Sequence, residues 1–214
     1  VQLSGDRDVR AEQVVSKEIG YRYQPTARLL FDFAGFWNSY TEMATVEPGV
    51  PQFEFTPIPH VVVPSTFVNM GELEIFGGEF VADYKPFHNW KVQSSYSYLR
   101  ILSDLRPGSL DQSLHPAEKK SPRHQAVVRS QLSITEDVDF DTTLRYVSAT
   151  SEGGGEGYTE LDLRLGWKPF ESVDISIIGQ NLLADSHKEF KGSFISYPTE
   201  EVQRSVWGRV TFTF

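Results

Sequence analysis

Hydrophobic and polar residues alternate along much of the chain with a period of two. The segment YTELDLRLGW, at residues 158–167, places three leucines and a tryptophan on one side and Glu160, Asp162 and Arg164 on the other. Successive side chains of a β-strand point to opposite faces, so this pattern predicts a strand with one apolar and one polar face. The segment VDISIIGQN alternates in the same way after the short connection KPFES. The two segments together predict a β-hairpin.

The same strand–turn–strand unit recurs along the chain, in EIGYRYQPTARLLFDFAGFWNSY, FGGEFVADYKPFHNWKVQSSYSYL and RHQAVVRSQLSITEDVDFDTTLRYVSA. With a strand at the C-terminus, the pattern predicts an all-β antiparallel meander of about nine strands and no convincing helix. The connections alternate in length: short turns at 24–27, 85–89, 135–139 and 168–172 separate longer loops at 43–66, 104–121, 151–157 and 185–201. Alternate connections of a meander lie at the same end of the sheet. Short turns at one end and long loops at the other are typical of outer-membrane β-barrels.

Aromatic residues gather near both ends of the predicted strands. One group lies near the short turns or the terminus, at Tyr21, Tyr23, Phe31, Tyr84, Phe87, Trp90, Phe140, Trp167, Phe170, Phe212 and Phe214. A second lies toward the long loops, at Trp37, Tyr40, Tyr96, Tyr98, Tyr146 and Tyr158. Aromatic side chains prefer the headgroup level of a bilayer, and the face between the groups is aliphatic. The pattern therefore favours a membrane barrel, with the charged face as a solvated wall that offers cross-strand ion pairs.

Composition narrows the function classes. No segment approaches the roughly 18 apolar residues of a membrane helix, which excludes helical membrane proteins only. The chain has no cysteine, which excludes disulfides and thiolate metal sites. Its net charge of −9 and the lack of a basic stripe argue against a nucleic-acid partner. The opening VQLSGDRDVR lacks the apolar core of a signal peptide.

The chain ends in GRVTFTF, with Val210, Phe212 and Phe214 on one face. A register kept to the last residue predicts that this strand closes a sheet and removes its edges. Single-chain bacterial barrels have even strand numbers, so nine strands predict the C-terminal portion of a larger barrel.

Several segments, in order, resemble the barrel of TonB-dependent outer-membrane receptors. The hairpin from EIGYRYQPT to FWNSY, the strand FGGEFVADYKP, the entry SPRHQAVVRSQL and the strand YTELDLRLGWKP each resemble a barrel motif of that family. VDISIIGQNLLADSHKEF resembles its penultimate hairpin, and EVQRSVWGRVTFTF resembles its closing strand, with Gln203 where proline is usual.

This resemblance implies that residues 1–214 form about the last nine strands of a 22-stranded barrel, with the plug domain, TonB box and signal peptide absent from this chain. It implies uptake of a scarce nutrient, most typically a ferric siderophore or similar metal chelate, and no enzymatic activity. The implied partners are outer-membrane lipid, the barrel-assembly machinery, TonB acting through the plug, and the small-molecule chelate. The implied location is the bacterial outer membrane, with the C-terminus on the periplasmic side and Phe214 as part of the assembly signal.

Few residues point to a binding site. His60, His187, Phe53 and Tyr40 lie in or near the predicted long loops and are the candidate ligand contacts, although a solvated loop histidine is the simpler interpretation. No two histidines have a metal-ligand spacing, so we expect no catalytic residue, no cofactor and no metal site. Asn181, where a strand meets a loop, is predicted to cap the backbone with its amide.

Two alternatives remain open at this point. One is a smaller complete barrel of eight or ten strands, acting as an adhesin or an outer-membrane enzyme. The other is a soluble β-sandwich binding module, which would bury in its core the aromatic residues that a barrel exposes at the membrane interfaces.

Overall fold

The computed structural model describes residues 2–112, 119–151, 155–189 and 201–213, and its fold is built from β-strands. The strands of the main sheet are long, at β2 (Gln13–Thr26), β3 (Leu29–Pro48), β6 (Pro64–Phe87), β7 (Trp90–Leu105), β8 (His124–Ser133), β9 (Val138–Val147), β10 (Tyr158–Phe170), β11 (Val173–Gln180) and β14 (Ser205–Phe212). The short strands are β1 (Gln2–Ser4), β4 (Gln52–Glu54), β5 (His60–Val62), β12 (Ser186–His187) and β13 (Val202–Gln203).

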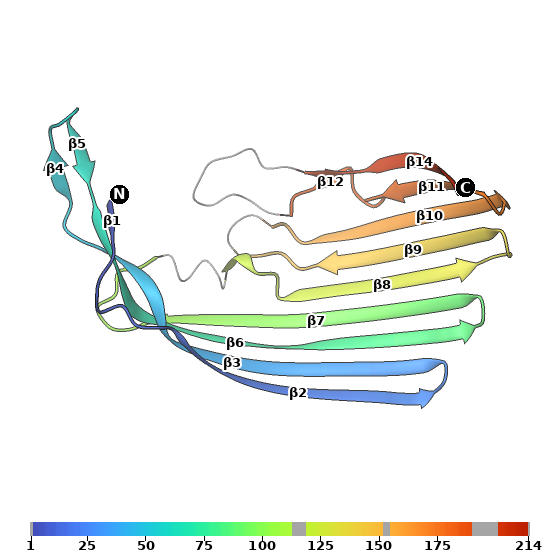
Figure 1. Cartoon of the computed structure of the whole chain (residues 1–214), viewed down its shortest axis with the longest axis horizontal. Helices are drawn as coiled ribbons and strands as arrows, with labels where there is room; N and C mark the ends of the chain where they lie inside the picture. The colour runs from blue at the N-terminus through green and yellow to red at the C-terminus, as the bar shows by residue number, and fades with distance from the viewer. Residues whose placement is uncertain (1, 113–118, 152–154, 190–200, 214) are drawn as a thin grey trace. The chain divides into compact units, whose positions relative to one another are not determined.

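The main sheet is an antiparallel meander. Its strands follow one another in the order β14-β11-β10-β9-β8-β7-β6-β3-β2, so each long strand pairs with its neighbours along the chain (Figure 1). The predicted all-β meander of nine strands is therefore confirmed. One pairing was not predicted: β1 lies parallel to the start of β6, with Gln2 opposite Pro64.

The chain divides into two compact units. The first comprises Val1–Glu18, Phe36–Phe76 and Arg100–Ser121, and it contains the hairpin of β4 and β5. The second comprises Ile19–Gly35, Gly77–Leu99 and Pro122–Phe214. It contains the four tight turns, at residues 27–28, 88–89, 134–137 and 171–172.

The register of the second unit places side chains of one kind in rows across the strands. Phe140 lies opposite Leu132 on one side and Leu165 on the other, and Leu165 lies opposite Ile177. The adjacent row on the other face places Asp141 opposite Arg164. The sequence alternation therefore becomes one continuous apolar face and one continuous polar face, because paired residues of an antiparallel sheet share a face.

No described segment of the chain covers the apolar face. Among the described residues, Leu73 is the one large hydrophobic side chain that is buried. Leu165, Trp167 and Ile177 are 46%, 51% and 59% exposed. The aromatic residues near the tight turns are exposed as well, at Tyr21, Tyr23, Tyr84, Phe87, Phe170 and Phe212. A β-sandwich core would bury these side chains, so the sandwich alternative is wrong.

Some predicted loop boundaries are wrong. Residues 43–66 were predicted as one long loop, but β3 continues to Pro48, β6 begins at Pro64, and β4 and β5 form a hairpin between them. The tight turns are also shorter than predicted, because the strands continue through Lys85 and Lys168. Backbone pairing with neighbouring strands extends these segments after the apolar alternation has ended.

The described residues form no helix that is long and apolar enough to span a membrane.

Candidate functional site

The polar face of the second unit carries cross-strand ion pairs. Arg145 Nη1 lies 3.1 Å from Glu160 Oε2, and these two residues are register partners on β9 and β10. Arg164 reaches Asp141 at 3.1 Å and Asp174 on β11 at 3.5 Å. The ion pairs expected from the alternation are present, and they tie β9, β10 and β11 together on one face.

The segment after β11 lies over the start of β10. Asn181 follows β11 in the left-handed backbone region, with φ of 51°, and its side chain is fully buried. Its backbone N–H donates to Asp162 Oδ1 at 3.0 Å, and its Nδ2 donates to the Val202 carbonyl at 2.9 Å. These bonds join the beginning and the end of the connection to β10. The short strands β12 and β13 then pair through His187 and Val202.

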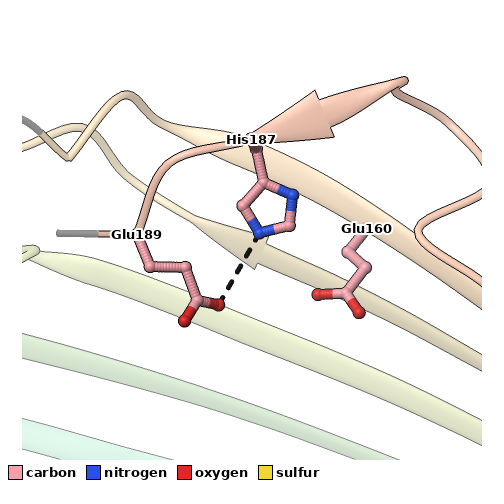
Figure 2. A group of neighbouring side chains, drawn as sticks. All are labelled: Glu160, His187 and Glu189. Carbon is pink, nitrogen blue, oxygen red and sulfur yellow. Dashed lines mark ion pairs between the residues drawn. The ribbon is translucent and has the colours of Figure 1, made fainter. Parts of the chain in front are cut away.

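This path brings His187 beside two glutamates, from β10 and from the segment after β12 (Figure 2). One donor atom from each of Glu160, His187 and Glu189 lies within 4.8 Å of the others. His187 Nε2 is 3.6 Å from Glu189 Oε1. Figure 2 shows the imidazole between the two carboxylates, one on each side. We call these three residues the His187 cluster.

The His187 cluster is enclosed by its neighbours. The ring of Tyr158 stacks on His187 with centroids 3.9 Å apart, and its hydroxyl donates to Glu189 Oε1 at 3.0 Å. The His187 side chain is 6% exposed, and neither ring nitrogen makes a hydrogen bond. Glu160 is 7% exposed, so the expectation that it is a solvated wall charge is wrong, because the segment with His187 covers it.

The two residues that flank His187, Ser186 and Lys188, are held by Glu201. The Ser186 hydroxyl donates to Glu201 Oε2 at 2.8 Å, and Lys188 Nζ lies 3.4 Å from Glu201 Oε1. The hydrogen bond from Ser186 and the nearby Lys188 ammonium together lower the pKa of Glu201. This carboxylate therefore stays charged near neutral pH and fixes the residues on both sides of His187.

A second group of charges lies in the first unit, and we call it the Arg106 cluster. Arg106 Nη2 lies 3.0 Å from Glu42 Oε1, and its Nε lies 3.2 Å from Glu72 Oε1. Glu42 has a φ of 56°, and its carbonyl accepts a hydrogen bond from Asn69 Nδ2 at 2.6 Å. The hydrogen bond from Arg106 lowers the pKa of Glu42. Asn69 also accepts from the backbone N–H of Arg10 at 2.7 Å, which fastens the start of the chain to β6.

The structure separates the four predicted ligand contacts. His187 is in the second unit. Phe53 and His60 lie together on the β4–β5 hairpin of the first unit, where Phe53 is 75% exposed and His60 Nε2 is 3.5 Å from Glu54. Tyr40, also in the first unit, lines a separate pocket of about 370 Å³ with residues of β6 and β7.

The residues predicted to close the barrel lie on the last strand. Val210 and Phe212 are on β14, opposite Ile175 and Val173, and their side chains are 56% and 61% exposed. Phe214 lies outside the described residues. Strands β14 and β2 are the two ends of the sheet order, so in the described part of the chain β14 pairs with β11 alone.

Sequence reasoning missed the His187 cluster because it searched for metal-ligand spacing among histidines. Glu160 and His187 are far apart in the sequence and meet only because the segment after β11 turns back over β10. A weak signal was available: Glu160 lies on the polar face at the long-loop end of a strand, and Glu189 follows His187 by two residues. Tyr158 also differs from its expected role, since it lies on the face of Glu160 and stacks on His187 instead of facing outward.

The chain matches one protein family by sequence. The model of the family described as "TonB dependent receptor-like, beta-barrel" matches residues 1–182. No curated protein matches the chain.

Solved structures of the same architecture are similar over nearly the whole chain. The FrpB iron transporter of Neisseria meningitidis has a TM-score of 0.72 and 16% identity, with 99% of this chain and 33% of that protein covered. The ferric-catecholate import receptor Fiu of E. coli has a TM-score of 0.69 and 19% identity, with 96% and 28% covered. The copper transporter OprC has a TM-score of 0.67 and 16% identity, with 97% and 33% covered. At these identities the likeness shows the fold, and the chain spans about a third of the length of each protein.

Proposed function

This chain belongs to the TonB dependent receptor-like β-barrel family, and on that premise we propose that it forms part of the barrel wall of an outer-membrane receptor for TonB-dependent uptake of a metal chelate, such as a ferric siderophore. Family members are receptors and transporters, which are not enzymes. The similar solved structures include importers of iron, of ferric catecholate and of copper.

The exposed apolar face of the second unit is the observation that carries this proposal. Its middle consists of aliphatic side chains such as Val128 and Leu144, and aromatic side chains lie nearer the strand ends. Strands β8, β9 and β10 have 10, 10 and 13 residues, against the about 9–11 that a tilted strand needs to cross a bilayer. Lipid is the solvent that such a face requires, since water would make its exposure costly.

The polar face then lines the lumen. Its charges are paired across strands, as at Arg145 with Glu160 and Arg164 with Asp141. Paired charges on an aqueous wall give a polar path without a large field of one sign.

The proposal also sets an orientation and a set of partners. The tight turns and the C-terminus lie on the periplasmic side, and the long connections face the outside. Val210 and Phe212 lie on β14, which closes the barrel, and with Phe214 they form the signal that the barrel-assembly machinery engages. TonB acts through a plug domain supplied by the complete protein, and Asn181 fixes the entry to the last long connection.

Ligand contact is assigned to the long connections. Phe53, which is 75% exposed on the β4–β5 hairpin, offers an apolar surface opposite Val61, and His60 lies on the same hairpin opposite Glu54. Tyr40 and His187 are the other candidates. An exposed aromatic side chain on such a hairpin suits the planar groups of an iron chelate.

Uptake by the complete protein tests the proposal. A strain lacking the gene would receive the complete receptor, and uptake of radioactive iron from a panel of ferric siderophores would be compared with and without a working TonB. We expect uptake of at least one chelate that requires both. Phe53→Ala should reduce that uptake several-fold, and Val50→Ala, an 80% exposed residue of the same connection, should not. Uptake of every ferric siderophore in the panel that is equal with and without the receptor would contradict the proposal.

A further inference from the structure

We propose that Glu160, His187 and Glu189 bind one divalent transition-metal ion directly, through one imidazole and two carboxylates. Zn²⁺ is the ion used to test this site. This inference goes beyond transport of a chelate, because it concerns an ion held by side chains of this chain. It rests on the geometry of the second unit and not on the proposed function.

A buried histidine without partners is the first reason. The imidazole of His187 is 6% exposed, and within the described part of the chain neither Nδ1 nor Nε2 has a hydrogen-bond partner. Buried polar groups are nearly always paired. A neutral imidazole nitrogen beside two carboxylates is a donor of the type that divalent transition metals bind.

The local charge is the second reason. Glu160 and Glu189 contribute two negative charges, and the guanidinium of Arg145 contributes one positive charge at 3.1 Å from Glu160 Oε2. The cluster is therefore left with net negative charge when His187 is neutral. The neighbouring Asp162 adds to this negative charge, which a divalent cation would offset, and Arg145 contacts Glu160 through Oε2.

The surrounding hydrogen bond is of the kind that orients metal ligands. Tyr158 donates to Glu189 Oε1 at 3.0 Å and packs its ring on the imidazole at 3.9 Å between centroids. Metal-ligating side chains are usually fixed by such outer partners. Tyr158 thus fixes both a ring and a carboxylate that face the same point.

The distances require a small closure on binding. The three donor atoms lie within 4.8 Å of one another, whereas two ligands of a zinc ion, each about 2.1 Å from the metal, are at most about 4.2 Å apart. Glu189 has a side chain 51% exposed, and rotation of its carboxylate toward Glu160 would supply this closure. One imidazole and two carboxylates suit zinc, iron(II) and manganese(II), with water completing the coordination.

A direct contact between His187 and Glu189 is the alternative to a bound metal, since Glu189 Oε1 lies 3.6 Å from His187 Nε2. In that case the three side chains hold one another without an ion, and the protein binds no zinc at this site.

Zinc titration of the complete receptor, purified in detergent and stripped with a chelator, separates the two. We expect one Zn²⁺ bound per protein at this site by calorimetry. Loss of an outer partner alone costs metal affinity about 10- to 100-fold, so His187→Gln and Glu189→Gln should each weaken binding by at least about tenfold. Glu189→Gln changes an exposed side chain, and so it keeps the test valid if His187→Gln fails to fold.

His60→Gln is the matched control. It removes a histidine that also faces a glutamate, Glu54 at 3.5 Å, but has a 39% exposed side chain and one carboxylate only. We expect unchanged zinc binding in this variant. Co²⁺ bound to the wild-type protein should also show visible absorption bands that Glu189→Gln weakens. Zinc binding that is absent from the wild-type protein, or equal in the wild-type, His187→Gln and Glu189→Gln proteins, would overturn the proposal.

Discussion

The hydrophobic face of the main sheet is exposed and its charged face is partly buried, which is the reverse of a water-soluble protein. On one face Leu165 and Ile177 lie side by side and are 46% and 59% exposed. On the other face Arg164, on the same strand as Leu165, has a side chain only 23% exposed and is paired with two aspartates. The hydrophobic residues are uncovered, and the charged residues are satisfied within the protein.

This difference identifies the solvent of each face. An exposed aliphatic face of this extent is costly in water, whereas in a bilayer it has no cost. Charges that are paired across strands suit an aqueous wall, as where Arg164 contacts Asp141 and Asp174 and where Arg145 contacts Glu160. The contrast therefore supports a wall with lipid on one side and water on the other.

The largest expected effect comes from placing a charge on the apolar face. Leu144→Lys would put an ammonium at the middle of β9, where it faces lipid, and should cost about 2–4 kcal/mol of folding free energy. Thr143→Lys, one residue away on the polar face and between Arg129 and Asp162, should cost less than about 1 kcal/mol. Urea unfolding of the complete receptor in lipid vesicles measures both, and equal costs would remove the distinction between the faces.

The next effect comes from removing the shared cation of the polar face. Arg164→Met would leave Asp141 and Asp174 without their partner, and we expect a loss of about 1–3 kcal/mol from these partly buried carboxylates. Arg22→Met removes an arginine whose side chain is 72% exposed and paired with Asp32, and should cost less than about 1 kcal/mol. The same unfolding assay ranks the two, and a larger cost for Arg22 would contradict the assignment of the inner wall.

A smaller effect is expected in assembly at the end of the chain. Phe214→Ala should lower the amount of folded receptor in the outer membrane several-fold, because the terminal aromatic is proposed to anchor the closing strand at the interface. Thr213→Ala, its neighbour of opposite parity, should leave the amount unchanged. Quantitative blotting of membrane fractions measures the folded receptor in both variants. Equal amounts in the two would show that Phe214 has no role in assembly.

The smallest effect concerns the charges beyond the sheet's membrane span. A strand crosses with about 9–11 residues, so β3, which begins at Leu29, has left the bilayer before Glu42. Arg106 lowers the pKa of Glu42 in the folded protein. A carboxyl group with a lowered pKa stabilises the fold at pH values above its pKa in the unfolded chain. This stabilisation is lost as the pH falls through the pKa of the folded protein. At pH 7 the backbone amide of Arg106 should therefore exchange its hydrogen more slowly in the wild type than in Glu42→Gln. The difference should vanish well below the ordinary glutamate pKa of 4.5. A difference that persists in acid would assign the effect to something other than this charge.

The faces and the meander could be predicted from the sequence because they follow from alternation alone. Leu161, Leu163 and Leu165 share a face in any strand, whatever packs on them. The extension of β3 to Pro48 and the β4–β5 hairpin could not be predicted, since these residues lack the contrast between lipid and water that makes alternation visible. The parallel pairing of Gln2 with Pro64 depends on a contact between distant segments and leaves no local pattern.

The candidate site was less accessible to sequence reasoning. His187 was recognised as a loop histidine, but its environment depends on a turn at Asn181 that brings it over Glu160. That turn requires a residue in the left-handed backbone region with a buried side-chain amide. An asparagine in the sequence allows such a turn, but it does not predict where the following segment goes. The partners of a loop residue become known only when the loop's conformation is known.

The most direct test of the account is the behaviour of the complete protein in membranes. Cells expressing it would be fractionated, and the outer-membrane fraction would be run on a gel with and without boiling in detergent. The account predicts a protein confined to the outer membrane whose mobility shifts on boiling, as a closed barrel unfolds. A protein recovered without detergent, with the same mobility before and after boiling, would contradict the assignment of the exposed apolar face to lipid.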